Sequence, residues 1–219
     1  MKPVPLAFAC LMLLSKPVGA VDLNGTAEIV DGDTLEIEGS TIRLFGIDAP
    51  ETGQLCGRAG QKLFRPSEDA ISRLQSLSRG RVRCQGTEYD DYGRLIATCF
   101  SQAGIEINRS LVKEGLAWAF VKYSDAYAKE EMDAQALRLG IWQMGCEPPW
   151  IFREKRWRVA EQKAPNGCPI KGNISGNGKI YHTPWSRYYA QTGVNTKRGE
   201  RWFCNEKEAT DAGWRLPVR

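Results

Sequence analysis

The chain has 219 residues, and its hydrophobic content of 42% is enough for a real core, which excludes wholesale disorder. No stretch approaches the ~20 apolar residues needed to cross a bilayer. The net charge of +4 is uneven, because residues 163–219 carry ten Lys and Arg against four Asp and Glu, whereas residues 21–162 are net acidic. A protein that coats DNA would be basic throughout. We therefore expect an acidic body that concentrates carboxylates around a cation, and a basic tail that attracts polyanions or cell-surface charge.

Residues 1–20 have the pattern of a signal peptide. Lys2 provides a positive start, PLAFACLMLL an apolar centre, and residues 18–20 a small-residue cleavage site. Lys16 and two early prolines depart from the pattern, so a disordered or membrane-tethering tail is the alternative. We expect an exported protein, either periplasmic or secreted.

Six cysteines remain after residue 20, and an even number in an exported chain favours disulfides. They are Cys56, Cys84, Cys99, Cys146, Cys168 and Cys204. No CxxC pair is present and His182 is the only histidine, so a Cys/His zinc finger lacks suitably spaced ligands. Zinc held by Cys168, His182 and Cys204 is a less favoured alternative to a disulfide.

Short alternations of apolar and polar residues, broken by DGD and EGS turns, predict strands in the first half of the chain. The predicted strands are 26–31, 34–38, 41–47, 81–85 and 94–100. The last two flank the turn-rich EYDDYG as a hairpin. In such a hairpin Cys84 and Cys99 fall at comparable distances from the turn, so a disulfide between them is geometrically plausible.

Helices separate these strands. Pro66 suits the first turn of a helix that runs to about Leu77. A second helix over 105–115 ends at Gly115, and a third over 124–140 has a Ser or Asp cap and Gly140 as its stop. Five short strands with interleaved helices predict an α+β, mainly β fold built on a small barrel rather than on a parallel sheet.

Residues 148–167 form a basic amphipathic segment followed by a linker. We expect a solvated helix that packs Trp150, Phe152 and Trp157 on the barrel. This segment divides the mature chain into a barrel domain over 21–147 and a small module over 168–219.

Four carboxylates lie within the stretch IVDGDTLEIEGSTIRLFGIDAPET. Asp31 and Asp33 are two apart on a strand and project from one face, while Pro50 holds Asp48 and Glu51 on either side of a rigid bend. Hard divalent cations prefer carboxylate and carbonyl oxygens. Asp33, Asp48 and the carbonyl of Ala49 would supply such ligands, so a Ca²⁺ ion would offset the cost of clustering these acids.

Two arginines indicate the substrate. Arg43 lies between the acid pairs, and Arg94 closes the DDYGR turn. Guanidinium groups grip phosphate oxygens and stabilise charge that grows in a transition state. With a cation, two arginines and Glu51 to activate a water, the sequence predicts a site that hydrolyses phosphodiesters.

The stretch quoted above, DDYGR, the helix ending in LVKEGLA and a closing LGIW together resemble the staphylococcal nuclease-like, or thermonuclease, family. The resemblance runs from about residue 26 to 143, with the motifs in the family's order. It implies a five-stranded OB-type barrel with three helices, and Ca²⁺-dependent cleavage of DNA and RNA.

The resemblance also implies roles for single residues. Those matching Asp33 and Asp48 hold calcium, with Asp31 close by; those matching Arg43 and Arg94 bind the scissile phosphate. Glu51 matches the usual candidate for the general base, and Tyr92 and Tyr123 match tyrosines that line the nucleotide pocket.

The sequence departs from the best-known family member at three positions. Ala49 replaces a threonine, which matters little if only its carbonyl binds metal. Val121 replaces a pocket tyrosine and Asp91 replaces a lysine. These two changes leave nucleotide affinity and base preference unpredicted, but they do not alter the predicted reaction.

In the tail, Asn205 and Glu208 have capping-box spacing, Gly213 would end a short helix, and KIYH and RWFC read as strands. So small a core needs a staple, and Cys168–Cys204 is the obvious one. By elimination, Cys56 would pair with Cys146.

The tail is similar to a small module, sometimes called a sunset domain, that is appended to bacterial nuclease-like proteins and has no settled activity. Several of its aromatic residues lie among basic ones and could stack bases, but we favour a role in the module's own core. These residues are Tyr181, Trp185, Tyr188, Tyr189 and Trp202. We expect His182 to be a surface or packing residue.

We therefore predict an exported, monomeric, Ca²⁺-dependent nuclease for DNA and RNA, with a C-terminal module that could bind nucleic acid or cell envelope. One alternative is a non-catalytic OB-fold module that binds nucleic acid without cutting it. Another is an envelope-associated structural or adhesion protein with a relic barrel.

Overall fold

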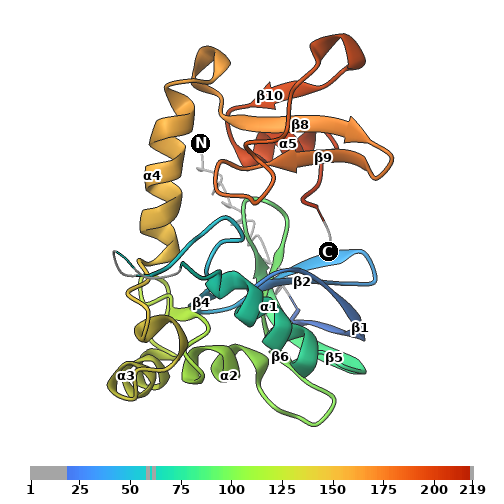
Figure 1. Ribbon diagram of the computed structural model, residues 1–219. Coiled ribbons are helices and arrows are strands. Elements are labelled where there is room, and N and C mark those ends of the chain that lie inside the picture. Colours follow the sequence, from blue (N-terminus) through green and yellow to red (C-terminus); the bar gives the residue numbers. More distant parts are fainter. Residues whose placement is uncertain (1–18, 58–59, 61–62, 218–219) are drawn as a thin grey trace, which may run out of the picture.

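The computed structural model describes residues 19–57, 60 and 63–217. A barrel and a small C-terminal sheet lie at opposite ends of the molecule, and one long helix runs alongside both (Figure 1). All but the last two residues of the predicted signal peptide lie outside the described residues, so that prediction is not tested here. No helix in the described part of the chain is long and apolar enough to span a membrane.

Five strands close into a barrel in the order β1-β2-β3-β6-β5. Every neighbouring pair is antiparallel except β3 and β6, which run parallel. The strands are β1 (Val21–Asp31), β2 (Thr34–Ile37), β3 (Ser40–Leu44), β5 (Arg81–Tyr89) and β6 (Leu95–Phe100). The predicted mainly β fold with a five-stranded barrel is thus confirmed.

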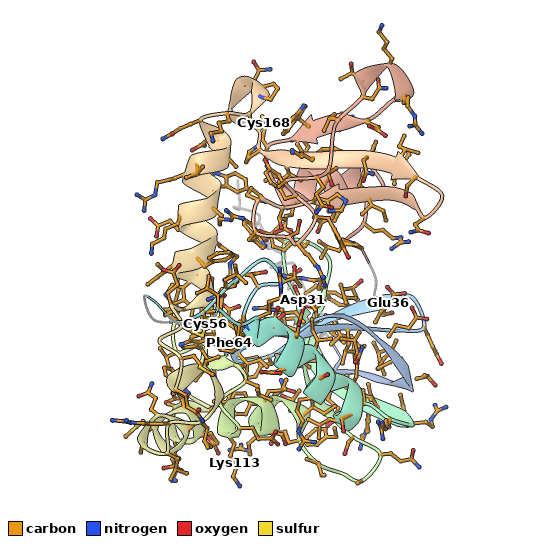
Figure 2. The ribbon with its side chains drawn as sticks, viewed as in Figure 1. Asp31, Glu36, Cys56, Phe64, Lys113 and Cys168 are labelled. Carbon is orange, nitrogen blue, oxygen red and sulfur yellow. A yellow bond between two sulfur atoms is a disulfide. The ribbon has the colours of Figure 1, made fainter. Side chains whose placement is uncertain are left out.

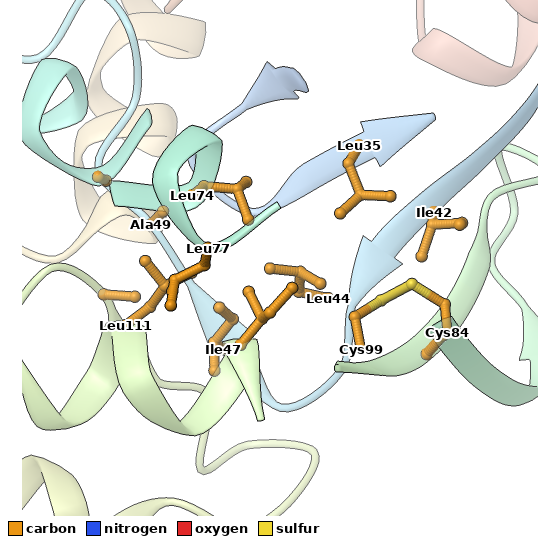
Figure 3. Close-up of a cluster of buried hydrophobic side chains, with 14 of the residues drawn as sticks. Leu35, Ile42, Leu44, Ile47, Ala49, Leu74, Leu77, Cys84, Cys99 and Leu111 are labelled. Atoms are coloured by element: carbon orange, nitrogen blue, oxygen red, sulfur yellow. A yellow bond between two sulfur atoms is a disulfide. The ribbon is translucent and has the colours of Figure 1, made fainter. Parts of the chain in front are cut away.

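Alternating side chains of these strands fill the barrel. Leu35, Ile42 and Leu44 point inward and are almost fully buried, and Cys84 faces Cys99 across β5 and β6 (Figure 3). The two cysteines form the predicted disulfide. Because the interior is apolar throughout, charged groups of the same strands are left to gather at the rim.

Helices α1 (Pro66–Leu77) and α2 (Ile107–Lys113) close the bottom of the barrel. Leu74, Leu77 and Leu111 project from them into the same core (Figure 3). Helix α1 has the predicted bounds, with Pro66 in its first turn, where a missing N–H costs nothing. Helix α2 is shorter than predicted but is followed by the expected Gly115.

The third helix differs from its prediction at both ends. Helix α3 covers Ala128–Ala136 and has no side-chain cap, since the preceding residues form turns that bury Tyr127 against Gly46. Gly140 does not stop the helix but begins a 3₁₀ turn, Gly140–Trp142. The N–H of Ile141 donates to the carbonyl of Gly115 at 2.9 Å, and a Cβ at Gly140 would collide with that carbonyl.

A two-stranded ribbon, β4 (Ile47–Asp48) with β7 (Trp118–Ala119), lies beside the barrel. Helix α4 (Pro149–Glu161) then runs from the barrel to the C-terminal sheet (Figure 1). Trp150 stacks on Phe120 as expected, with ring centroids 5.7 Å apart. Trp157 does not pack on the barrel as predicted: its ring lies 6.2 Å from that of Trp185, in the C-terminal module.

The C-terminal module is a three-stranded sheet in the order β10-β8-β9, with one short helix. Asn205 caps that helix by accepting the N–H of Glu208 at 2.8 Å, and Gly213 follows it, as predicted. The elements are β8 (Ile170–Ser175), β9 (Gly178–His182), a 3₁₀ turn (Thr196–Arg198), β10 (Arg201–Phe203) and α5 (Glu206–Asp211).

Of the five tail aromatics that we expected in the module's core, only Tyr181 belongs to it, together with Ile170, Phe203, Ala209 and Trp214. Trp185 is only half-buried, and Tyr188 is 49% exposed. The strands are too short for a larger core, so the remaining aromatics lie at its edge.

The other two predicted disulfides are also present. Cys168–Cys204 joins the start of β8 to the end of β10, so those thiols are not available for zinc. Cys56–Cys146 ties the loop after the DAPET bend to the segment that precedes α4. Cys56 lies near the lower end of α4, and Cys168 near its upper end (Figure 2).

Candidate functional site

The first acid pair sits on the turn between β1 and β2, at the barrel rim that faces the C-terminal sheet (Figure 2). Asp31 accepts the N–H of Gly32 at 2.8 Å, and Asp33 is nearly buried. A Cβ on Gly32 would lie 2.8 Å from that of Ala49, so glycine is what allows this turn to approach the next acid-bearing segment.

The second acid pair flanks Pro50, directly after β4. Asp33 Oδ2 accepts the backbone N–H of Ala49 at 2.8 Å, which locks the two segments together. Asp48 is fully buried, and Glu51 is nearly so. A hydrogen bond between residues sixteen apart in the chain thus holds the two acid pairs close together.

Arg43 on β3 lies between the two pairs. Its guanidinium forms ion pairs with Asp33 and with Asp48 Oδ1, the latter at 2.9 Å. Burial by itself would lower the pKa of Arg43. The charges of the two aspartates outweigh this effect and raise the pKa above its usual value, so the guanidinium stays charged. One arginine therefore compensates two buried carboxylates.

A third arginine, which was not predicted from the sequence, also belongs to the cluster. Arg153, on α4, donates to both oxygens of Asp48 at 3.0 and 2.7 Å and to Glu51 Oε1 at 2.7 Å. A signal was present, since Arg153 lies three residues after Trp150 and four before Trp157, on the face that packs against the protein. An arginine on a packed helical face needs an anionic partner.

Arg153 lowers the pKa of both carboxylates, but the net shifts of the two are opposite. Burial alone would raise the pKa of Asp48, but Arg43 and Arg153 lower it below its usual range. Burial raises the pKa of Glu51 well above its usual range, and Asp31 and Asp48 add to this against the pull of Arg153. Asp48 is thus held ionised, while Glu51 is brought nearer to the range in which a carboxylate accepts protons effectively.

Arg94 approaches from the hairpin between β5 and β6. Its guanidinium pairs with Asp90 on its own turn, with Nε to Oδ2 at 2.7 Å, and lies 5.2 Å from the ring centre of Tyr92. Only 19% of the Arg94 side chain is exposed. The turn therefore fixes Arg94 in one orientation.

A cleft of about 1130 Å³ collects these groups. Predicted residues that line it are Asp31, Asp33, Arg43, Ala49, Glu51, Tyr92, Arg94 and Tyr123. Asp48 lies behind them, bonded to Arg43 and Arg153. Asp91 lines the cleft, and Val121 is exposed outside its lining. His182 is buried, which agrees with the predicted packing role, and its Nε2 lies 3.2 Å from Asn173 Oδ1. His182 also lines the cleft.

The donor chemistry of this cluster fits a hard divalent cation. An ionised carboxylate has about four acceptor sites. Hydrogen bonds and ion pairs with described residues use three of these sites on Asp33 and three on Asp48. Oδ2 of each aspartate can therefore still accept a cation. Arginines hold these acids in the arrangement seen. Within the described ranges, no three Asp, Glu, His or Cys side chains are grouped closely enough to hold a metal by themselves.

Comparison with known proteins agrees with the site. The family model described as staphylococcal nuclease homologue matches residues 41–144, and a second, described as ArfC, matches residues 158–216. The micrococcal nuclease of Shigella flexneri is 31% identical over 74% of this chain and 94% of its own length. An uncharacterized endonuclease of Escherichia coli O157:H7 is 30% identical over 71% and 99%. The succinoglycan biosynthesis protein ExoI of Rhizobium meliloti is 33% identical over 63% and 74%.

The barrel, the cleft of acids and arginines, and these similarities define a hydrolytic nuclease, an enzyme that cleaves the phosphodiester bonds of nucleic acid. More particularly, the chain belongs to the staphylococcal nuclease family, whose members depend on a metal.

Proposed function

We propose that the protein is an exported, Ca²⁺-dependent nuclease that hydrolyses DNA and RNA with little sequence specificity. The observation that carries this proposal is the shared cleft in which Arg43, Arg94 and Glu51 converge from three separate segments. The cleft offers guanidinium groups for the backbone phosphate, which every sequence presents. Low specificity follows, because phosphate contacts carry no base information.

In the proposed reaction a water attacks phosphorus in line with the leaving 5′-oxygen. Glu51 accepts the proton of the water as the new O–P bond forms and the P–O5′ bond breaks, and the leaving 5′-oxygen takes a proton from solvent to become the hydroxyl. Arg43 and Arg94 neutralise the charge that grows on the phosphoryl oxygens. The resemblance to the family suggests products with 3′-phosphates and 5′-hydroxyls.

Asp33, Asp48 and the carbonyl of Ala49 would hold the calcium ion, with Asp31 close by. When bound, the ion supplies positive charge that draws a phosphate oxygen into the cleft. Arg153 keeps Asp48 ionised, which is the form a metal requires.

Digestion of single-stranded and double-stranded DNA and of RNA, with Ca²⁺ or with a chelator, tests the proposal. We expect cleavage only with the metal. Arg73→Ala is a matched control, because Arg73 pairs with Glu114, which does not line the cleft, and this variant should cut normally. Intact nucleic acid at every calcium concentration, with binding retained, would instead establish the non-catalytic binding module.

The export part of the proposal has its own support and test. Three disulfides join all six cysteines of the mature chain, and such bonds persist in oxidising compartments. Mass spectrometry of the protein from its native cell should find Val21 as the first residue. A chain that retains residues 1–20 in a reducing compartment would contradict export.

A further inference from the structure

The cleft has a second wall that the barrel does not supply. Besides the barrel residues, it is lined by Trp157 of α4 and by residues of the C-terminal module. The module's lining residues include Trp185, Arg187, Tyr188 and Glu206. The barrel rim and the module therefore face each other across the predicted catalytic groups.

The loop after β9 docks on the bend that carries Glu51. The N–H of Gly53 donates to the carbonyl of Trp185 at 3.1 Å, and the N–H of Arg187 donates to Thr52 Oγ1 at 3.1 Å. A Cβ at Gly53 would lie 2.4 Å from the Trp185 carbonyl oxygen, so the two backbones meet as closely as a glycine permits. The second wall is fixed next to the proposed general base.

Helix α5 places the module on the opposite side of the cleft. Glu206, the first residue of α5, accepts a hydrogen bond from the hydroxyl of Tyr181 at 2.9 Å and lines the cleft with Arg94. Burial raises the pKa of Glu206, against the opposing pull of the positive charge on Arg94. The module thus extends over the cleft from Glu51 to Arg94.

The surface of this wall carries several aromatic rings and the cation of Arg187. Trp157 and Trp185 lie with ring centroids 6.2 Å apart, and the guanidinium of Arg187 lies 5.6 Å from the ring centre of Tyr188. Aromatic faces beside cations bind unpaired bases, which stack on the rings while the cations follow the backbone. Tyr188 remains 49% exposed, so its ring is open to a ligand.

We propose that the module wall is a binding subsite for the unpaired bases that flank the scissile phosphate, and that this wall, which the barrel does not supply, contributes to the preference for single strands over duplex. This inference rests on the proposed function. A flexible single strand can place a phosphate between the walls and turn its bases onto Trp185 and Tyr188. A duplex is a stiff rod with its bases paired inside, so it can offer neither.

Cleavage rates of a short single strand and of its duplex, in DNA and in RNA, test the inference on the full chain. Native protein should cut the single strand at least about tenfold faster. Trp185→Ala and Tyr188→Ala should each slow single-strand cleavage about fivefold or more and leave the duplex rate unchanged. Trp185→Ala keeps the backbone bond to Gly53, and Tyr188→Phe, which keeps the ring, should retain native selectivity. Tyr89→Ala removes an exposed aromatic that does not line the cleft, so it should change neither rate.

A strand that lacks the bases beside the cleaved phosphate provides the second measurement. Native protein should cut it more slowly than the complete strand, and this difference should be smaller in Trp185→Ala, which retains only the ring of Tyr188. Equal loss on single strand and duplex, or an unchanged ratio in both alanine variants, would overturn the subsite. Absence of all cleavage by native protein would overturn the proposed function instead.

Discussion

The two walls of the cleft are built in different ways. The barrel wall has a large apolar core, and its charged residues come from neighbouring segments that hydrogen-bond to one another. The module wall has a small core and a disulfide, and it reaches the cleft through one loop, one helix terminus and α4. In our proposals the barrel provides the groups for chemistry, and the module selects the nucleic acid that reaches them.

Arg153 bonds helix α4 to two buried acids of the barrel wall, so its removal should have the largest effect on stability. Among the described ion pairs, Arg153→Met leaves Asp48 with Arg43 alone and Glu51 with no arginine, which should cost about 3–5 kcal/mol of unfolding free energy. Added Ca²⁺ should recover part of that loss, because it binds only the folded site. Urea unfolding with and without calcium measures both effects.

Arg158 supplies the matched control on the same helix. It is exposed and pairs only with Glu154 one turn away among the described ion pairs, so Arg158→Met should cost less than about 1 kcal/mol. Equal stability of the two variants would show that Arg153 is not a structural counter-ion of the acids.

Loss of Arg94 should separate chemistry from stability. Arg94→Ala should lower kcat by about 10²–10³-fold, because the charge that faces the growing phosphoryl charge is gone. Its partner Asp90 lies at a hairpin end, so the unfolding midpoint should move little. Rate measurements at saturating calcium, with circular dichroism as the check on folding, decide this; near-native turnover would reject the phosphate role.

Arg43 is a poorer choice for the same test. It pairs with two buried aspartates, so among the described ion pairs Arg43→Ala would leave Asp33 without a cation and Asp48 with Arg153 alone, and it would lower stability together with turnover. The sequence alone favoured either arginine equally.

The smallest predicted effect concerns Gly53, where the loop after β9 docks on the bend that carries Glu51. Gly53→Ala adds a methyl group where the Trp185 carbonyl already lies, which should cost about 1–3 kcal/mol or push the module away. We expect the preference for single strands to fall more than the total activity. Gly176→Ala is the control, since a Cβ there meets nothing within 4 Å. Unchanged selectivity in Gly53→Ala would mean that the wall position does not matter.

Local patterns in the sequence predicted much of the barrel. Pro66 and an apolar stripe gave α1 its bounds, the hairpin turn placed Cys84 opposite Cys99, and the spacing around Pro50 predicted where the acids meet. Each of these depends on residues close in the chain or on one repeated period.

Contacts between residues far apart in the chain could not be predicted from such local patterns. Arg153 meets Asp48 from 105 residues away, and the module loop meets Thr52 from 135. No periodic pattern encodes which distant surface a helix will face. The edge aromatics were placed in the core for a related reason, because composition says that Trp and Tyr are buried but not against which partner.

The Cys56–Cys146 bridge ties the loop after the bend at Pro50 to the segment that leads into α4, and Gln54 Nε2 donates to the carbonyl of Glu147 at 2.7 Å alongside it. The helix that carries Arg153 begins two residues later, at Pro149. The alignment of a guanidinium with two carboxylates is therefore anchored by sulfur chemistry as well as by packing. A thiol-rich solution that reduces this disulfide would weaken that anchor without changing any charged group.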